Sequence, residues 1–274
     1  MKDRYSLMSS GSGSRFANPL LDEHAPTLPF ELAVSTEYYV TKGQDIAFRC
    51  DAKEGGTYFC KDDKNGRAIR ATEWFFTRLA GHLGVPVPEC RVLVQRNGNR
   101  VFGSLMSPST ADDNDAMHYL STPQRDEIGA PIERMGRFLS GITALDLFAN
   151  NPDRGLHNFI LNGPPGRRTL RPIDFASADI MSLASERFPG PQSPTVTDGR
   201  FLRRAHGFFL DASLEMVDRL AGVPESAISD ILNDAPAEWM NASSKGAIVE
   251  VWRKRGFEVR LSAIRQGLRD GSLL

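Results

Sequence analysis

The chain has 274 residues, enough for one large domain or for two lobes with a sizeable buried core. Its composition of 41% hydrophobic and 24% charged residues is that of a globular protein and excludes a disordered or fibrous chain. The formal net charge of −1 gives no overall attraction to nucleic acid or anionic lipid, so we expect neither as a direct partner.

The N-terminal residues 1–29 are polar and rich in Ser and Gly, and we expect a loose leader there. No apolar run approaches the roughly 20 residues that cross a bilayer, and no secretory signal is present. The cysteines Cys50, Cys60 and Cys90 are too few and too scattered for a disulfide framework and fit a reducing compartment. We therefore expect a cytoplasmic protein without a membrane span.

Short β-rich runs separated by turn residues dominate the first third of the chain. The hairpin signal Asn97-Gly98 joins the last two of them. Apolar residues at steps of four predict a helix over 71–83, which Gly84 and Pro86 end. We predict a five-stranded antiparallel sheet with this helix after its third strand. The predicted strands are 37–41, 45–50, 57–61, 91–96 and 100–105.

The rest of the chain is predicted to be mostly helical. Helical spacing of apolar residues extends over 131–148, and two short β-like runs follow at 159–161 and 170–173. A long Pro-, Gly- and Ser-containing segment over 188–199 separates them from amphipathic helices that begin at Leu202. The simplest assembly is a small β-rich lobe joined to a larger helical lobe.

The acidic run 112–115 has the composition of a calcium loop. It lacks the glycine and the terminal glutamate of such loops, and it therefore predicts a solvated turn.

Three polar residues have the spacing that phosphoryl transfer needs. Asp153 precedes Asn158 by five positions, and a predicted hairpin then returns the chain to Asp174 at a strand end. One carboxylate can orient the attacking hydroxyl, while the amide and the second carboxylate hold Mg²⁺ against nucleotide phosphates. Taken singly, each aspartate is also explained by an ordinary turn or helix cap.

A lysine and a glutamate of the first third support the same chemistry. Lys61 closes the third predicted strand, and Glu73 lies twelve residues later in the following helix, where a phosphate-binding lysine and its orienting glutamate are expected. The alternative is a solvated lysine and a glutamate on the exposed helix face. Glu73 shares a helical face with Phe76 and Ala80, which favours a partly buried carboxylate that needs a cationic partner.

These motifs together resemble the HipA-like kinases, bacterial relatives of the protein kinase and phosphoinositide kinase folds. The resemblance covers roughly residues 35–268. It implies an α+β, bilobal protein-kinase-like fold, with a nucleotide-covering lobe over 30–107 and a catalytic helical lobe over 108–274. It also implies ATP as the phosphate donor and Mg²⁺ as the cofactor. The motifs that carry it are Tyr58–Lys61, the helix around Glu73, Leu83–Pro88, Asn151–Asn158 and Ile173–Ala176.

Carried over residue by residue, the resemblance implies that Lys61 contacts the α and β phosphates and that Glu73 pairs with Lys61. Asp153 would be the hydroxyl-orienting base. Asn158 and Asp174 would be the Mg²⁺ ligands.

The remaining nucleotide contacts are implied with alternatives. The backbone of Ser104, Leu105 and Met106 would form the hinge that meets the adenine, the alternative being an apolar strand without adenine contact. Gly43 is the only glycine offered by the phosphate-covering turn. His157 lies in the same loop as Asp153, and for it a structural hydrogen bond to the loop backbone is favoured over proton transfer.

The expected function is ATP-dependent phosphorylation of a Ser or Thr hydroxyl of a protein. A lipid or small-molecule kinase of the same fold is an alternative. So is a nucleotide-binding pseudokinase or scaffold, which the sparse glycine turn motivates. An unrelated α+β protein with coincident motifs is the last alternative. The sequence indicates no oligomeric state.

Overall fold

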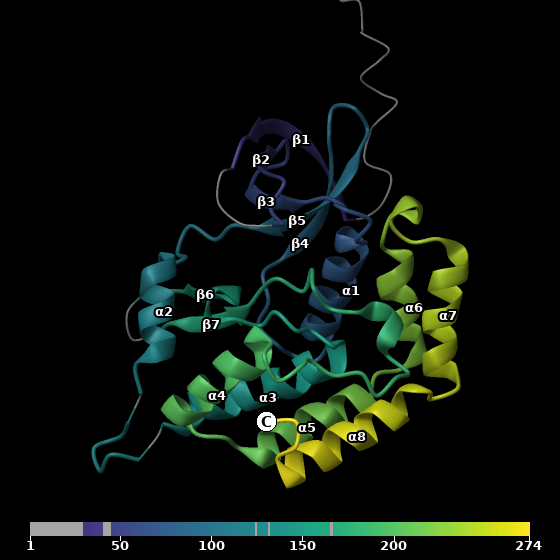
Figure 1. Ribbon diagram of the computed structural model, residues 1–274. Helices are drawn as coiled ribbons and strands as arrows, with labels where there is room; N and C mark the ends of the chain where they lie inside the picture. Colours follow the sequence, from purple (N-terminus) through teal and green to yellow (C-terminus); the bar gives the residue numbers. More distant parts are fainter. Residues whose placement is uncertain (1–29, 41–44, 124, 131, 165–166) are drawn as a thin grey trace, which may run out of the picture.

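The computed structural model describes residues 30–40, 45–123, 125–130, 132–164 and 167–274 (Figure 1). Five strands of the N-terminal region form a closed barrel in the order β1-β2-β3-β5-β4. Their bounds are β1 Glu31–Tyr38, β2 Phe48–Ala52, β3 Thr57–Lys61, β4 Cys90–Val94 and β5 Arg100–Leu105.

The prediction of a five-stranded antiparallel sheet is wrong in one pairing. The pairs β1–β2, β2–β3, β3–β5 and β4–β5 are antiparallel, but β1 pairs in parallel with β4, so that Glu31 lies opposite Val92. This pairing closes the barrel and leaves no unpaired sheet edge. β1 also begins at Glu31, six residues before the predicted start, and β2 begins at Phe48 rather than at 45. A pairing between strands so distant in sequence leaves no local pattern, which is why the sequence did not predict it.

Helix α1, Ile69–His82, follows β3 and lies close to the predicted range. It packs against β4 and β5 with a face of buried residues that includes Glu73. Trp74 donates from Nε1 to the carbonyl of Ile231, 2.8 Å away. Its ring makes edge contacts with Phe30 and Trp239. α1 is therefore fixed to the barrel and to the C-terminal helices at once.

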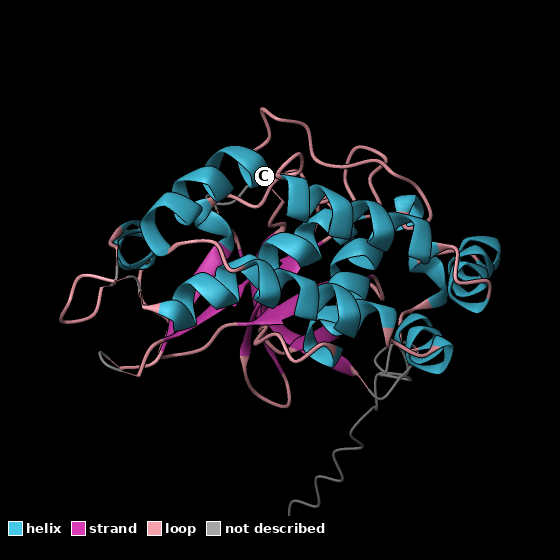
Figure 2. Cartoon of the chain, turned by 90° about the horizontal axis from the view of Figure 1, so that it is seen from below, coloured by secondary structure: helices cyan, strands magenta, loops and turns pink. Residues whose placement is uncertain are grey.

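The remaining chain is mostly helical, with one two-stranded hairpin (Figures 1 and 2). The longest helix, α3, packs against α4, α5 and α8, and its buried residues join the core that also contains the inner face of α1. No helix in the described ranges is long and apolar enough to cross a membrane. The elements are α2 Asp113–Ser121, α3 Glu133–Ala149, β6 Phe159–Asn162, β7 Thr169–Pro172, α4 Pro194–His206, α5 Leu210–Ala221, α6 Glu225–Asn233, α7 Ala242–Arg253 and α8 Phe257–Asp270.

Two segments that were predicted to lack helix are helical. Asp112 caps the N-terminus of α2 by accepting a hydrogen bond from the backbone N–H of Asp115, 2.8 Å away, so the acidic run opens a helix instead of forming a turn. Pro194 is the first residue of α4, which begins inside the segment predicted to be irregular. Proline suits this position because the first helical N–H needs no partner within the helix.

Candidate active site

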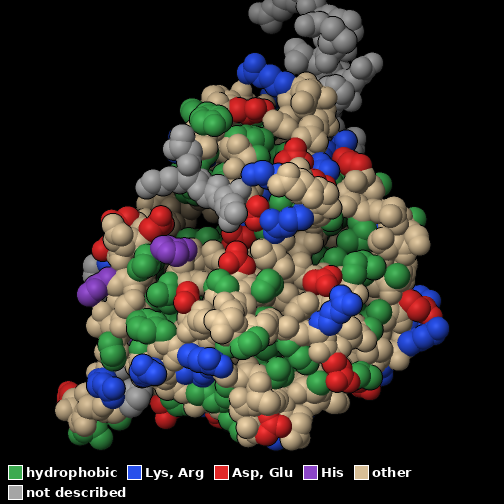
Figure 3. Space-filling model, in the orientation of Figure 1, with side chains coloured by type: hydrophobic (Ala, Val, Ile, Leu, Met, Phe, Trp, Pro, Cys, Tyr) green, Lys and Arg blue, Asp and Glu red, His purple; other side chains and the backbone are tan. Residues whose placement is uncertain are grey.

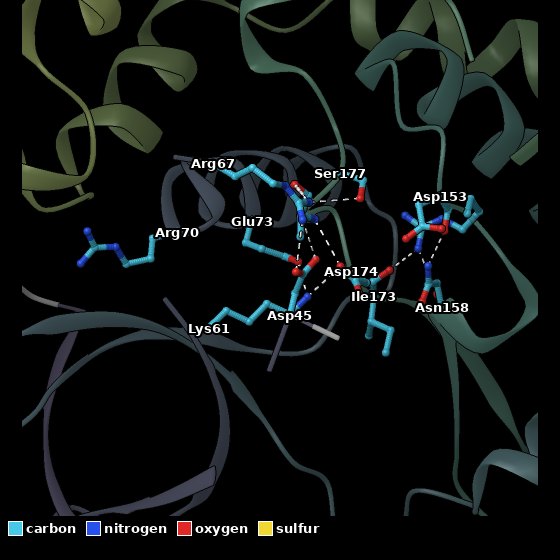
Figure 4. A network of polar contacts seen from close by, with 12 residues as sticks. Asp45, Lys61, Arg67, Arg70, Glu73, Asp153, Asn158, Ile173, Asp174 and Ser177 are labelled. Carbon is cyan, nitrogen blue, oxygen red and sulfur yellow. Dashed lines mark hydrogen bonds and ion pairs between the residues drawn. The ribbon is translucent and has the colours of Figure 1, made fainter. Parts of the chain in front are cut away.

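Lys61 is at the centre of the candidate site. At the end of β3 it is buried, and its Nζ lies 2.5 Å from Oε1 of Glu73 and 2.7 Å from Oδ1 of Asp174 (Figure 4). The three residues come from β3, from α1 and from the segment after β7. The structure thus brings together three of the predicted site residues, two of which are 113 positions apart in sequence.

The charges of these three groups are strongly coupled. Burial acts to lower the pKa of Lys61, but the carboxylates of Glu73 and Asp174 together outweigh burial and raise that pKa above its ordinary value. Burial acts to raise the pKa of Asp174, and Lys61 outweighs it, so that pKa is lowered. Burial raises the pKa of Glu73 to about 7 against the opposing effect of Lys61. Lys61 and Asp174 are therefore both charged at neutral pH.

The backbone around Asp174 is unusual. Asp174 has φ +62°, a left-handed conformation that few residues other than glycine adopt and that concentrates at functional sites. Its Oδ1 also accepts from the backbone N–H of Ala176 at 3.3 Å. The next side chain, Phe175, is fully buried and stacks on Phe76 of α1. Because Phe76 follows Glu73 by three residues, one helix supplies the partner of Lys61 and also holds the segment that presents Asp174.

Asp153 and Asn158 lie together on the loop before β6 (Figure 4). Asn158 donates from Nδ2 to the backbone carbonyl of Asp153, which leaves its Oδ1 as the free acceptor. Asp153 is exposed. The surrounding protein still removes part of the water around its carboxyl. This partial desolvation, followed by the negative charges of Asp174 and Asp45, raises the pKa of that carboxyl. Asp153 therefore shares the electrostatic field of Asp174 although the two make no direct hydrogen bond.

Arg154 organises this loop, a role that the sequence did not reveal. It is buried and pairs in bidentate fashion with Asp146 of α3, Nε to Oδ2 at 2.9 Å and Nη2 to Oδ1 at 3.1 Å. Its Nη1 donates to the carbonyls of Asn158, 3.0 Å away, and of Ile173. Arg154 therefore ties together the two chain segments that carry Asn158 and Asp174. The available sequence signal was an aspartate inside the apolar helix, which needs a buried cation.

The start of α4 supports the same loop. Thr195 accepts from the backbone N–H of Arg154 at 2.9 Å and donates to the carbonyl of Asn151 at 2.5 Å. Asp198 accepts from the backbone N–H of Leu156 at 3.1 Å. These contacts were missed because the sequence predicts an irregular segment where α4 begins.

A second arginine, Arg67, connects the barrel to the Asp174 segment. Its guanidinium lies 3.2 Å from Oδ1 of Asp45 and donates to the carbonyl of Ala176 at 2.9 Å and to the hydroxyl of Ser177 at 3.2 Å (Figure 4). On the face shown in Figure 3, acidic and basic side chains gather around a hollow between the barrel and the helices.

The predicted hinge at Ser104, Leu105 and Met106 stays a prediction, and the structure shows how its backbone is bonded. β5 ends at Leu105 as expected, but the backbone N–H of Leu105 donates to Glu89 at 2.8 Å and that of Met106 donates to Thr57 at 2.8 Å. These two N–H groups are bonded within the barrel, so a backbone donor to adenine would have to come from beyond Met106. Ser104 lies within β5, between β3 and β4.

Two further residues belong to the predicted site, Gly43 and His157. Gly43 lies outside the described residues. His157 is exposed, and its side chain makes no hydrogen bond to any residue in the described part of the chain, so the expected bond to the loop backbone is not found.

The residues at the site fit Mg²⁺ in their chemistry. Asn158 and Asp174 offer amide and carboxylate oxygens, the hard ligands that Mg²⁺ prefers. Among the described residues, no group of three or more His, Cys, Asp or Glu could hold a metal ion. Mg²⁺ needs no such group, because it is commonly held by one or two carboxylates together with substrate phosphates.

Comparison with known proteins gives a family match and similar folds. A family profile described as HipA-like kinase matches residues 36–107, which confirms the predicted resemblance over the barrel and α1. The crystal structure of the Helicobacter pylori proinflammatory kinase CtkA superposes with a TM-score of 0.55 at 12% identity, covering 85% of this chain and 98% of CtkA. This similarity shows a mixed α/β, kinase-like fold.

Two other solved structures are more distant. HipA of Shewanella oneidensis MR-1, in a toxin–antitoxin complex with HipB and operator DNA, has a TM-score of 0.46 at 12% identity, covering 85% of this chain and 65% of HipA. The Golgi casein kinase with Mn/ADP bound has a TM-score of 0.46 at 14% identity, covering 90% of this chain and 75% of that kinase. No curated protein sequence matches the chain significantly.

Proposed function

We propose that the chain is an ATP- and Mg²⁺-dependent kinase that transfers phosphate to a hydroxyl group, with a protein Ser or Thr as the acceptor. The family match supports the general statement that it is a kinase, a phosphotransferase. The observation that carries the proposal is the buried ion-pair cluster in which Lys61 contacts Glu73 and Asp174 together. Burying these charges costs desolvation free energy. Such clusters of buried charges are typical of functional sites, and a site that binds phosphate and metal needs them.

In this proposal, residues 30–107 form a nucleotide-covering lobe and residues 108–274 form a catalytic lobe. Glu73 holds the ammonium of Lys61 in place, and Lys61 neutralises charge on the α and β phosphates. Asn158 and Asp174 hold Mg²⁺, which when bound shields the negative charge of the phosphates.

Asp153 is proposed to orient the attacking hydroxyl and to accept its proton. Its exposure leaves it accessible to an acceptor. Partial desolvation, followed by the negative charges of Asp174 and Asp45, raises its pKa and makes it a better proton acceptor. Arg154 keeps Asp153 and Asn158 in register with Asp174 through the two carbonyls that it binds.

The test is incubation of the purified chain with γ-labelled ATP and a cell lysate. We expect Asp153→Ala and Asp174→Ala each to lower phosphate transfer by roughly 100- to 10,000-fold, the range of a lost general base or electrostatic contact. Asp230→Ala, which removes an exposed carboxylate of α6, is the matched control and should retain activity. Both active-site variants must keep the circular dichroism of the parent chain.

The chemical form of the label tests the acceptor class. Label that is recovered as phosphoserine or phosphothreonine after acid hydrolysis supports the protein acceptor. Label recovered only in the lipid extract, or in small molecules, would replace that part of the proposal. Transfer that persists in both aspartate variants would refute the assigned roles.

A further inference from the structure

A groove lies away from the Lys61 cluster, between α2, α3 and the start of β7, with a volume of about 600 Å³. We call it the α2–α3 groove, and its lining includes Tyr119, Ile132, Phe138, Leu170 and three arginines. The hairpin β6–β7 separates it from the candidate active site, because Asp174 follows the end of β7 whereas the groove meets its beginning (Figure 1). The rise of a strand places the two about 15 Å apart along the hairpin.

The three arginines of the groove are poorly neutralised. The exposed side chains of Arg134 and Arg167 have no acidic or hydrogen-bonding partner among the described residues. Arg168 has a loose contact, Nη2 to Oδ2 of Asp115 at 3.8 Å, and its Nε is buried without a hydrogen-bond partner. A buried guanidinium N–H without an acceptor is costly, so an acceptor supplied from outside would be stabilising here.

The groove also offers an apolar surface. Ile132, which lines the groove, is 41% exposed. The rings of Tyr119 and Phe138 are half-buried, and Leu170 beside them is buried. Exposed apolar side chains next to aromatic residues and arginines are typical of protein interaction sites.

We propose that the α2–α3 groove binds an acidic peptide segment of a partner protein. An apolar side chain of the segment packs against Ile132 and Phe138, and its carboxylates pair with Arg134, Arg167 and Arg168. The charge of the groove selects an acidic partner, and the open apolar floor selects a peptide rather than an inorganic anion, which would use the arginines alone. This inference does not depend on the proposed phosphoryl transfer.

The test is fluorescence anisotropy of a fluorescein-labelled peptide in which glutamates flank a Leu-Leu pair, titrated with the full chain. We expect Arg134→Glu/Arg167→Glu to weaken binding by about tenfold or more, since both rim charges are reversed. Ile132→Ser, and a peptide with Ser-Ser in place of Leu-Leu, should each weaken binding by several-fold, about the effect of losing one buried apolar contact.

The matched control is Arg204→Glu/Arg269→Glu, which reverses two exposed arginines of α4 and α8 and changes the net charge equally. It should leave the affinity almost unchanged. The proposal is overturned if the parent chain does not bind the peptide, or if both double variants lose the same affinity. It is also overturned if inorganic phosphate or ATP displaces the peptide as effectively as unlabelled peptide, because the groove would then be a small-anion site.

Discussion

Asp153 and Arg154 are neighbours in sequence, yet their surroundings give them opposite properties. Asp153 is exposed and is bonded through its backbone: its N–H donates to Oδ1 of Asn151, and its carbonyl accepts from Nδ2 of Asn158. Arg154 is buried, and its guanidinium is satisfied by Asp146 and by backbone carbonyls. We infer that Asp153 can be changed at little cost to the fold, and that Arg154 cannot, because its removal would leave the carboxylate of Asp146 buried without a cation.

This contrast gives a prediction at the residue scale. Arg154→Leu is expected to lower the free energy of unfolding by about 3–5 kcal/mol, the cost of breaking a buried ion pair. Asp153→Asn should change it by less than about 1 kcal/mol, as a substitution of an exposed residue. Urea denaturation followed by tryptophan fluorescence measures both. Equal stability of the two variants would contradict the structural role assigned to Arg154.

The contact between α3 and α4 is decisive at the scale of elements, because α4 carries Thr195 and Asp198 against the Asp153 loop. Gly136 of α3 allows this approach. A Cβ on Gly136 would lie 2.3 Å from the carbonyl oxygen of His206 and 2.3 Å from Cε2 of Phe209, too close for any real carbon.

Gly136→Ala should therefore force α4 away from α3. We expect it to destabilise the chain by roughly 1–3 kcal/mol, the usual cost of overpacking, and to lower catalytic activity through the displaced loop. The control is Gly246→Ala in α7, where a Cβ meets nothing within 4 Å. Alanine should stabilise that helix by roughly 0.5–1 kcal/mol. Thermal unfolding of the two variants compares them, and a stabilised Gly136→Ala chain would rule out the close packing as the cause.

For the whole molecule, the core is continuous from α1 through α3 to the C-terminal helices. The ion-pair cluster joins the barrel to the helical part of the chain, since Lys61 belongs to β3 of the barrel and Asp174 to the segment after β7. We infer that a nucleotide held between them would stabilise the entire chain rather than one part of it.

Thermal-shift measurements test this at the scale of the molecule. ATP with Mg²⁺ at 100 times its dissociation constant should stabilise the chain by about 2.7 kcal/mol. EDTA, or the variant Asp174→Asn, should remove the metal-dependent part of that shift. Stabilisation without phosphate transfer would favour a nucleotide-binding scaffold. The absence of any response to nucleotide would argue against both the kinase and the scaffold.

Local periodicity was sufficient for the elements that depend on neighbours in sequence. It predicted α1, α3, the hairpin at Asn97-Gly98 and the short strands β6 and β7 nearly at their observed bounds. The spacing of Asp153, Asn158 and Asp174 likewise identified residues that the structure places on one loop and the following hairpin. These patterns repeat every two to four residues, so a single sequence displays them.

Tertiary structure alone decided what depends on packing between distant segments. The parallel pairing of β1 with β4 and the contact of Lys61 with Asp174 each join segments that are far apart in the sequence, so no local pattern predicts them. Whether Lys61 was a solvated strand end or a buried cation depended on α1 and the Asp174 segment closing over it. Burial is a property of the assembled core. Only there is a charge removed from water, so that leaving it without a partner of opposite charge becomes costly.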